Sequence, residues 1–361
     1  MKLLFCLGSL GKGGAERVIS NLCDNFQDKL EIVVVTTIIS KNSYSIPKKV
    51  KVLSLDKKEV AASNFIQRNQ KRMKALEEII KIEKPDFIVS FLPEPSFRVL
   101  LLKDKYKIPT IVSVRNDPKV EYKGYLNKIM CKMLYPKADG FVFQTKEAQT
   151  YFSSKIQKKS VIIPNPINKE FLIEPYDGVR EREIVTVGRL TEQKNQKLLI
   201  EAFSNIKEEF PDYTLSIYGD GHLKEELKNY IVSLHLENRV FLKGVVDNIK
   251  EEIYKKSLFV LPSDYEGMPN SLMEAMALGV PSISTDCPCG GPKFLMNENC
   301  GILVPTKDVA SLSKAMRKVL NSEALQKEFS VNSSKYIKEN LNPDIICEKW
   351  FKYIEEIASR K

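Results

Sequence analysis

Residues 258–279 read LFVLPSDYEGMPNSLMEAMALG, which is a short apolar run, a polar turn and a helical pattern in direct succession. The run 258–261 is apolar throughout, as in a strand that is buried on both faces of a sheet. Pro269 and Asn270 favour the start of a helix, and Gly279 favours its end. The stretch therefore predicts a buried parallel strand followed at once by a helix, the repeating unit of α/β domains.

Apolar runs of this kind alternate with amphipathic stretches along the 361 residues. Strands are expected at 3–7, 32–37, 50–55, 87–90, 110–114 and 140–143, and then at 184–187, 214–218, 240–242, 258–261 and 281–284. The helical patterns cover 16–26, 70–82, 122–134, 195–209, 222–234, 271–278, 309–320 and 343–359. Strands that are apolar throughout and alternate with helices predict parallel sheets covered on both faces, here in two Rossmann-like domains.

The join between the two domains is marked by proline. Pro164 and Pro166 cannot lie inside a central strand, and a polar stretch follows them as far as Glu183. We expect an N-terminal domain at 1–165, a C-terminal domain at 180–342, and a last helix at 343–361 whose apolar stripe packs back on the first domain. Two such sheets that face each other leave a cleft at the carboxyl ends of their strands, where ligands bind.

The charge is unevenly distributed. Residues 1–170 hold 31 Lys and Arg against 17 Asp and Glu, whereas the remainder holds 25 against 29. The first half is therefore expected to seek an anionic surface. A nucleic-acid partner is not expected, because the basic half lacks interleaved aromatic residues and any recognised nucleic-acid module.

The seven cysteines and two histidines show no metal-ligand spacing, so we expect reduced thiols and no metal site. The apolar run at the N-terminus is too short for a signal peptide, and no stretch reaches transmembrane length. We expect a cytoplasmic protein whose contact with a membrane, if it makes one, is peripheral.

Two acidic residues flank the helix start in the opening stretch. Glu266 lies in the loop after the strand, and Glu274 lies about one turn into the helix. The amides of Asn270, Ser271 and Leu272 point outward at the positive end of this helix and predict an anion site. Hydroxyl-binding carboxylates beside an anion site suit a sugar nucleotide. The alternative is that Glu274 is a first-turn residue favoured by the helix dipole and Glu266 a turn residue.

Basic and glycine-rich loops follow other predicted strands. After the strand at 184–187, Arg189 can bind two phosphate oxygens and Lys194 adds a point charge. Gly13 and Gly14 follow the first strand in a loop that lets its backbone approach a ligand closely. That loop lacks the spacing of a phosphate loop and of a dinucleotide fingerprint, which argues against an oxidoreductase. A second glycine turn, with Gly219 and Gly221, follows the strand at 214–218.

These motifs resemble the retaining glycosyltransferase family 4, which has the two-domain GT-B fold. The resemblance rests on Glu266 and Glu274 with seven residues between them, on 187–190 with Lys194, and on 13–17. It covers nearly the whole chain. The loop 286–293 is similar to that of members that extend lipid-linked oligosaccharides in bacterial polysaccharide or glycan pathways.

The resemblance implies a role for each matched residue. Glu274 would hold the ribose hydroxyls and Glu266 those of the donor sugar. Arg189 and Lys194 would bind the diphosphate, helped by amides at the start of the following helix. These four side chains are the core of the expected site.

Backbone groups complete the expected donor site. Gly14, beside Gly13, would lie under the diphosphate from the first domain. Gly219 and Gly221 would line the nucleotide end, and the backbone at Val245 and Val246 would meet the base.

One feature departs from the family pattern. Many members carry a histidine after the fifth strand of the first domain, but the histidines of this chain are His222 and His235 in the second domain. The fifth strand is followed here by Arg115, Asn116 and Asp117, and any of the three is a candidate for the histidine's place.

The activity implied is transfer of a hexosyl or N-acetylhexosaminyl unit from a UDP-sugar, with retention, to a saccharide acceptor linked to a polyprenyl diphosphate. The chain contains no Asp-x-Asp, so no metal cofactor is expected. The alternative is a sugar-nucleotide-binding protein or epimerase of the same fold that makes no transfer to a lipid acceptor. A glycogen phosphorylase relative would need a pyridoxal lysine site and a much longer chain.

The acceptor side is inferred from charge. Basic residues gather at Lys48, Lys49, Lys51, Lys57, Lys58, Arg68, Lys71, Arg72 and Lys74. The helical pattern 122–134 has an apolar stripe with lysines around it, as in a helix that lies on anionic lipid at the inner face of the cell membrane. The alternative is that this stripe packs in the core beneath a sheet.

Overall fold

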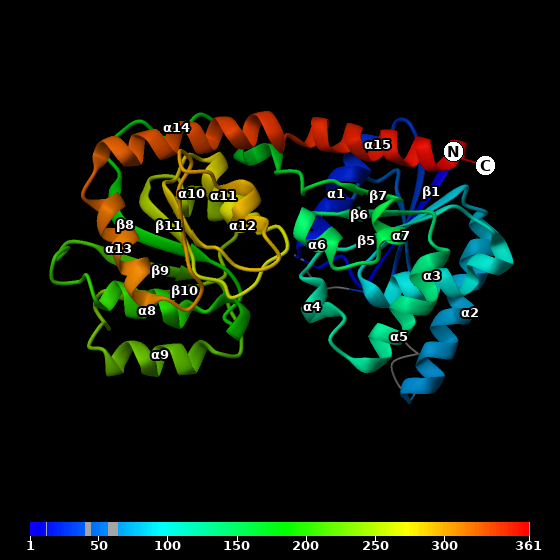
Figure 1. The fold of residues 1–361 in the computed structure, drawn as a ribbon, viewed down its shortest axis with the longest axis horizontal. Coiled ribbons are helices and arrows are strands. Elements are labelled where there is room, and N and C mark those ends of the chain that lie inside the picture. Colours follow the sequence, from blue (N-terminus) through cyan, green and yellow to red (C-terminus); the bar gives the residue numbers. More distant parts are fainter. Residues whose placement is uncertain (12, 40–44, 57–63, 361) are drawn as a thin grey trace. The chain divides into compact units, whose positions relative to one another are not determined.

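The computed structural model describes residues 1–11, 13–39, 45–56 and 64–360, which form two compact units (Figure 1). Unit 1 consists of Met1–Pro166 and Pro343–Lys361, and unit 2 of Ile167–Asn342. Three lysines that the sequence places in a glycine-rich loop or among the basic residues, Lys12, Lys57 and Lys58, lie outside the described residues.

Unit 1 contains a seven-stranded sheet in the order β3-β2-β1-β4-β5-β6-β7, with parallel pairing throughout. Its strands are β1 (Lys2–Leu7), β2 (Glu31–Thr36), β3 (Lys51–Ser54), β4 (Phe87–Phe91), β5 (Thr110–Ser113), β6 (Gly140–Phe143) and β7 (Ser160–Ile162). Leu4 of β1 pairs with Val33 on one side and Ile88 on the other. Because all strands run the same way, the loops that follow them meet at one edge of the sheet.

The helices of unit 1 are α1 (Gly14–Phe26), α2 (Phe65–Glu83), α3 (Pro93–Tyr106), α4 (Pro118–Glu121), α5 (Tyr125–Leu134), α6 (Lys146–Thr150), α7 (Ser154–Gln157) and α15 (Pro343–Ser359), with a 3-10 turn η1 (Tyr135–Lys137). Helices α2 and α3 cover one face, where Leu76 and Val99 pack with Leu4. Successive strand residues point to opposite faces, so Phe5 faces the other side. There Phe91 contacts Phe5 and stacks on Trp350 of α15.

The hydroxyl group of Tyr353 joins helix α15 to the sheet by hydrogen bonds. Tyr353 Oη accepts a hydrogen bond from Phe141 N at 3.1 Å and donates one to Lys159 O at 2.7 Å. A Cβ atom at Gly140 would lie only 2.6 Å from this hydroxyl, so glycine is needed there. The last helix of the chain is therefore an integral part of unit 1.

Unit 2 contains a six-stranded parallel sheet in the order β10-β9-β8-β11-β12-β13. Its strands are β8 (Glu181–Val187), β9 (Thr214–Tyr218), β10 (Val240–Gly244), β11 (Lys256–Leu261), β12 (Ser282–Thr285) and β13 (Ile302–Val304). Its helices are α8 (Gln196–Ser204), α9 (Lys224–Ser233), α10 (Ile249–Ile253), α11 (Asn270–Ala277), α12 (Gly291–Leu295), α13 (Val309–Leu320) and α14 (Glu323–Asn340), with the 3-10 turns η2 (Lys169–Phe171) and η3 (Glu192–Lys194).

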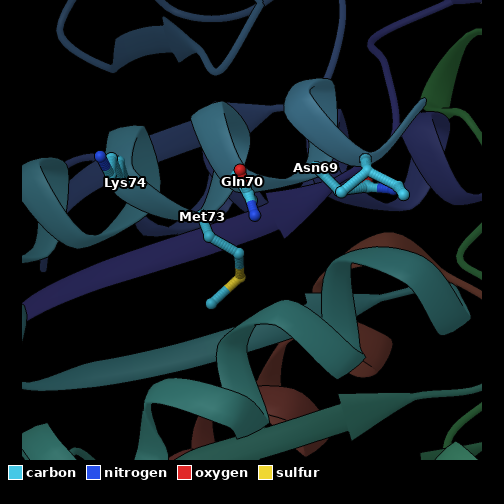
Figure 2. Close-up of a pocket in the computed structure, with 5 residues that line it drawn as sticks. Asn69, Gln70, Met73 and Lys74 are labelled. Atoms are coloured by element: carbon cyan, nitrogen blue, oxygen red, sulfur yellow. The ribbon is translucent and has the colours of Figure 1, made fainter. Parts of the chain in front are cut away.

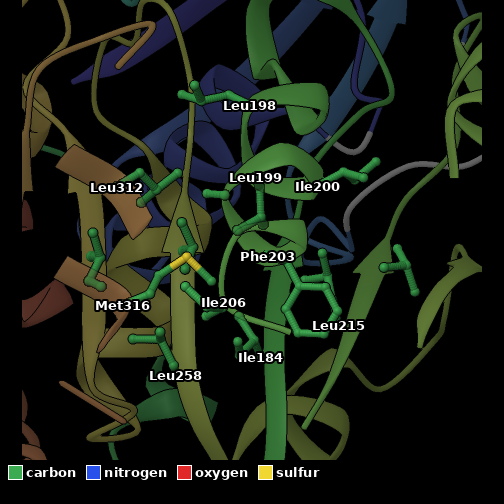
Figure 3. Close-up of a cluster of buried hydrophobic side chains, with 14 of the residues drawn as sticks. Ile184, Leu198, Leu199, Ile200, Phe203, Ile206, Leu215, Leu258, Leu312 and Met316 are labelled. Carbon is green, nitrogen blue, oxygen red and sulfur yellow. The ribbon is translucent and has the colours of Figure 1, made fainter. Parts of the chain in front are cut away.

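The core of unit 2 lies between this sheet and helices α8 and α13. Phe203 of α8 and Met316 of α13 are completely buried in one cluster with Ile184 of β8 and Leu258 of β11 (Figure 3). This packing holds α8, and with it the loop between β8 and α8, in a fixed place on the sheet.

The expected fold class is confirmed, because the chain forms two parallel α/β sheets. The structure adds two strands, β7 and β13, that the apolar pattern did not predict, and several helices, among them α3, α6, α7, α10, α12 and α14. Both strands have three residues. Helix α14 packs on α11 through serines, and Ser334 Oγ donates to Ala277 O at 2.9 Å. A helix that buries serine has no clear apolar period.

The helix expected at 122–134 begins only at Tyr125 in the structure, as α5. Helix α4 ends at Glu121, Tyr122 leaves the helical conformation with its ring buried, and Gly124 caps the start of α5. The helix expected from residue 195 begins instead at Gln196, because Asn195 adopts a left-handed conformation and its side chain caps α8.

Replacing Tyr353 tests the attachment of α15. Tyr353→Phe removes the hydrogen bond to Lys159 O and one of the two acceptors of Phe141 N, which also donates to Lys159 O at 3.0 Å, so we expect unit 1 to lose about 0.5–1.5 kcal/mol of stability. Trp350 is the only tryptophan of the chain, and its fluorescence during urea unfolding reports on α15. Tyr254→Phe is the matched control, because that hydroxyl donates to Glu174 O at an exposed position. Equal stability losses in the two variants would contradict the expected role of Tyr353.

Candidate active site

The loops after β8, β9 and β10 are joined by backbone hydrogen bonds at the carboxyl edge of the unit 2 sheet. Gly188 N donates to Tyr218 O at 2.9 Å, and Gly219 N donates to Gly244 O at 2.7 Å. Gly219 has a φ of +132°, and a Cβ atom there would lie 2.0 Å from Gly188 O. Only glycine fits this position. The predicted turn with Gly219 and Gly221 therefore packs against the loop that follows β8.

Gly221 makes the second close approach. A Cβ atom on Gly221 would lie 2.3 Å from Leu190 O, and Leu190 N donates to Asp220 O at 3.0 Å. Arg189 lies between Gly188 and Leu190 in the sequence, and its side chain is exposed. Among the described residues, it forms no ion pair. Its guanidinium is therefore available to an anion at this edge.

Lys194 and Glu266 form an ion pair at the same edge. Lys194 Nζ lies 2.5 Å from Glu266 Oε1, and their side chains are 16% and 7% exposed. Ser263 Oγ donates to the same oxygen at 2.7 Å. Two of the predicted site residues, 72 positions apart in the sequence, are thus brought into contact.

The pair is held by a second set of contacts between the β8 and β11 loops. Asn195 Nδ2 donates to Asp264 Oδ1 at 2.9 Å, and Asp264 N donates to Gln193 O at 2.8 Å. Gln193 Nε2 in turn donates to Tyr265 O at 2.9 Å. The residues on either side of Lys194 and Glu266 are therefore fixed to each other, which leaves little freedom to the ion pair itself.

The loop after β12 braces Glu266 from the other side. Glu266 N donates to Pro288 O at 2.7 Å, and Cys289 N donates to Glu266 O at 2.9 Å. A Cβ atom at Gly291 would lie 1.8 Å from Gly267 O, so these loops touch. Burial, with the nearby charge of Glu266, raises the pKa of the Cys287 thiol to about 12, so that this cysteine stays protonated at neutral pH.

The remaining donor-site candidates of unit 2 lie on the same edge. Asn270 and Ser271 are half-buried at the start of α11, while Leu272 and Glu274 are buried. Directly after β10, Val245 is exposed and Val246 is half-buried. The structure therefore gathers the predicted residues of unit 2 at the loops that follow β8, β9, β10 and β11.

Five predicted residues belong to unit 1, where they also follow strands, and one of them, Arg115, is buried. Gly13 caps α1, and a Cβ atom there would lie 2.3 Å from Glu16 Oε2, while Gly14 is exposed. Asn116 is half-buried. Asp117 is buried and caps α4, with Oδ1 accepting from Lys119 N at 2.9 Å.

The short helix α4 also carries a buried carboxyl group. Glu121 Oε2 has no hydrogen-bond partner among the described residues. Burial, with a smaller contribution from the charge of Asp117, raises the pKa of Glu121 to about 7. This carboxyl group therefore changes its charge near neutral pH.

Sequence reasoning missed the residues that support the ion pair. Ser263 and Asp264 belong to the polar turn of the opening stretch, and Gln193 and Asn195 flank Lys194. Their positions in strand-to-helix loops were the available signal. Their partners, however, follow from three-dimensional contacts between loops some 70 residues apart.

Unit 1 has surface pockets away from these residues. A pocket of about 670 Å³ is lined by Ile66, Asn69, Gln70, Met73 and Lys74 of α2, and Figure 2 shows the Met73 side chain extending away from the helix into it. Another, of about 400 Å³, is lined by Lys103, Asp104, Lys107 and Lys137. Neither pocket includes a residue predicted for the donor site.

Within the described ranges, no three His, Cys, Asp or Glu side chains gather as metal ligands would. In the same ranges, no helix combines the length and the apolar character needed to cross a bilayer.

Comparison with protein families matches both units. Residues 173–336 match the model described as Glycosyl transferases group 1, and residues 12–171 match Glycosyltransferase Family 4. An uncharacterized glycosyltransferase of Methanocaldococcus jannaschii is 33% identical over 68% of each chain.

A second relative is similar over the full length. It is the α-1,4-N-acetyl-D-galactosaminyltransferase of Campylobacter jejuni named for GalNAc-α-(1→4)-GalNAc-α-(1→3)-diNAcBac-PP-undecaprenol, 27% identical over 99% of each chain. Among solved structures, Anabaena HepE in complex with UDP has a TM-score of 0.83 at 17% identity, covering 99% of this chain and 100% of that one. That likeness shows the fold.

Stability should depend on pH through Glu121. Its pKa is raised from 4.5 to about 7 in the folded chain, so the unfolded chain loses this proton first as pH rises. Stability due to Glu121 is therefore complete below pH 4.5 and is lost between pH 4.5 and about 7. Glu121→Gln should remove this loss, which is about 2–3 kcal/mol.

Urea unfolding at about pH 5 and about pH 8 measures this difference. Glu147→Gln, at an exposed carboxyl on α6, is the control and should follow the wild-type protein. A wild-type pH profile that Glu121→Gln leaves unchanged would refute the assignment.

Proposed function

This chain belongs to glycosyltransferase family 4, a retaining hexosyltransferase family among the group 1 glycosyltransferases, and we propose that it moves a hexosyl or N-acetylhexosaminyl unit from a UDP-sugar to a polyprenyl-diphosphate-linked saccharide. In this proposal unit 2 binds the donor and unit 1 binds the acceptor. The polyprenyl acceptor and the UDP donor go beyond family membership, and separate observations support each.

The observation that carries the proposal is the ion pair between Lys194 and Glu266, with Arg189 exposed beside it. The departing diphosphate gains negative charge, which Arg189 and Lys194 are placed to neutralise. The amides at the start of α11 add positive potential at the same edge. The basic groups are thus arranged for a leaving diphosphate before the substrate arrives.

Glu266 serves the donor sugar in this proposal. Within the described chain, the recorded contacts of its side chain go to Oε1, from Lys194 and from Ser263. The carboxylate is thereby held in one orientation, and Oε2 is directed to a sugar hydroxyl. As the glycosidic bond lengthens, the negative carboxylate also stabilises the positive charge that develops on the sugar ring.

The acceptor attacks from the face that the diphosphate leaves. In this front-side route, which fits a retaining family, the departing phosphate takes the proton of the acceptor hydroxyl. Asn116 and Asp117 are the unit 1 residues that we assign to orient the acceptor hydroxyl. No covalent nucleophile is assigned.

Two observations support the choice of donor. A solved relative in fold, HepE, holds UDP. In this chain, Glu274 lies on α11, which follows the loop that carries Glu266, and Val245 and Val246 follow β10 on the same sheet. We assign the ribose to Glu274 and the base to the β10 loop.

The acceptor is inferred from the relative named for an undecaprenyl-linked glycan and from surface chemistry on unit 1. On α5, Tyr125, Leu126 and Met133 are 79%, 75% and 63% exposed. The interpretation of this stripe as core is therefore wrong for these three residues, whereas Tyr122 and Leu134 are buried. Exposed aromatic and aliphatic side chains suit an anionic membrane surface when they have lysines around them.

The lysines are present on the same segment. Lys119, Lys123, Lys128 and Lys132 are all exposed. Such a segment lies in the headgroup region by burying its apolar side chains while its ammonium groups contact anionic lipid. We propose that α5 holds the enzyme at the inner face of the cell membrane, where a polyprenyl-linked acceptor resides.

A panel of UDP-, GDP- and ADP-sugars tests the donor, with thermal shift and slow hydrolysis as readouts. UDP-sugars should stabilise the chain and be hydrolysed, and chelation with EDTA should leave the rate unchanged because the chain lacks Asp-x-Asp. Stabilisation without hydrolysis or transfer would favour the sugar-nucleotide-binding alternative. No response to any nucleotide sugar would contradict the proposal.

Removing the phosphate-binding cations should abolish most turnover. Arg189→Ala and Lys194→Met are each expected to lower kcat by about 100- to 1,000-fold, the effect of losing one electrostatic donor. Arg189 is exposed, so its variant should fold normally, whereas the Lys194 variant needs a thermal melt beside it. Lys228→Ala, an exposed lysine on α9, is the control. Near wild-type rates in both site variants would place the diphosphate elsewhere.

Vesicle sedimentation tests the membrane surface. The wild-type chain should sediment with phosphatidylglycerol vesicles and not with phosphatidylcholine ones, and salt should weaken the binding. The double variant Tyr125→Ser, Leu126→Ser should bind more than about tenfold more weakly, since burying even one large apolar side chain contributes about 1.5–3 kcal/mol. Val179→Ser, at an exposed valine of unit 2, should bind normally. Absence of any preference for anionic vesicles would remove this part of the proposal.

A further inference from the structure

Arg115 is a buried cation at the carboxyl edge of the unit 1 sheet. It is 8% exposed, and Nη1 donates to Asn165 Oδ1 at 3.0 Å. Its other nitrogens, Nε and Nη2, are buried without a hydrogen-bond partner among the described residues. Burial lowers the pKa of Arg115 to about 9. Such a cation costs free energy unless something else compensates for lost hydration.

Two aromatic rings provide that compensation. The guanidinium carbon Cζ lies 5.1 Å from the centroid of Phe91 and 5.2 Å from that of Trp350. The two rings themselves stack with a centroid distance of 5.9 Å. A desolvated contact of this kind is stronger than an exposed one, and the planar guanidinium suits it better than an ammonium group does.

The partners of Arg115 lie on the two parts of unit 1 that are continuous with unit 2. Asn165 directly precedes Pro166, the residue at which the first part of unit 1 ends and the chain continues into unit 2. Trp350 lies on α15, which begins at Pro343, where the chain returns. Gln144 Nε2 also donates to Asn165 Oδ1, at 2.6 Å, so the first segment is held from β6 as well.

Arg115 directly precedes the two residues that we assign to orient the acceptor hydroxyl. Asn116 and Asp117 follow it directly, and Asp117 caps α4. Because both unbonded nitrogens of Arg115 are buried, a substrate phosphate cannot reach them in this arrangement. The side chain is therefore placed to fix its neighbours rather than to contact substrate.

We propose that Arg115 is a positioning residue that holds the loop with Asn116 and Asp117 against Asn165, near the end of the first part of unit 1, and against Trp350 of α15, so that donor binding in unit 2 changes the surroundings of Trp350 and orients that loop. This inference rests on the proposed function. Donor binding in unit 2 is thereby linked to the position of Asn116 and Asp117 in unit 1.

Trp350 makes the link measurable, because it is the only tryptophan of the chain. UDP, GDP and ADP are titrated into the full-length wild-type protein while calorimetry measures binding and tryptophan emission is recorded. The nucleotide that binds should change the emission, with the dissociation constant that calorimetry gives.

Arg115→Lys keeps the charge and removes the planar stacking and the fixed hydrogen bond. We expect unchanged nucleotide affinity, no emission change on binding, and a kcat lowered by about 100-fold at unchanged donor KM, the effect of a 1 Å misplacement at the reacting centre. Arg239→Lys is the matched control, because Arg239 also stacks on a ring, that of Phe203, in unit 2. It should keep the emission response and the wild-type kcat.

Asn165→Ala provides a second variant if Arg115→Lys fails to fold, since it removes the hydrogen bond and leaves the stack. It should reduce the emission response and kcat in the same direction. Nucleotide binding with a silent tryptophan, or an Arg115→Lys variant with the normal response and rate, overturns this inference and leaves the transferase proposal standing. Binding of none of the three nucleotides overturns the proposed function and this inference with it.

Discussion

Parallel strand pairing is the constraint on which the whole molecule depends. In each unit every strand runs in the same direction, so the loops that follow the strands meet along one edge of the sheet. Loops are the part of an α/β unit that is free to carry polar side chains, because strands and helices bury apolar ones. In unit 2, backbone and side-chain hydrogen bonds connect the loops that follow β8, β9, β11 and β12, which together form one polar surface. Lys194 and Glu266 sit at its centre.

The two sheet edges have different chemistry. The unit 2 edge presents an exposed guanidinium, a nearly buried ion pair and the start of α11, which together suit an anion with hydroxyls beside it. The unit 1 edge buries its arginine between aromatic rings and its Glu121 carboxyl without a hydrogen-bond partner for Oε2 in the described chain. Groups of the first kind are prepared to meet a charged ligand, whereas those of the second kind fix the loops around them. This difference is the physical basis for assigning donor binding to unit 2 and acceptor positioning to unit 1.

Much of the fold was predictable because fully buried strands leave apolar runs in the sequence. The prediction failed where burial uses other chemistry. Strand β7 is only half-buried along its three residues, and α14 packs on α11 through serines. In the site, the residue types and their loops were predictable, because glycine, arginine and carboxylate residues recur in the loops that follow the predicted strands, and packing alone gives few reasons for that. The contacts were not: Lys194 and Glu266 are 72 residues apart, and the support from Ser263 and Gln193 depends on how two loops meet. Roles assigned to single side chains, including Glu274 and Asp117, stay predictions.

A crystal structure of the full-length chain with bound UDP tests the central claim most directly. We expect diphosphate oxygens within hydrogen-bond distance of the Arg189 guanidinium and of Lys194 Nζ, with the ribose hydroxyls on Glu274. We also expect Lys194 to share its ammonium group between the phosphate and Glu266. A nucleotide bound at another surface, with Lys194 paired to Glu266 alone, would contradict the account.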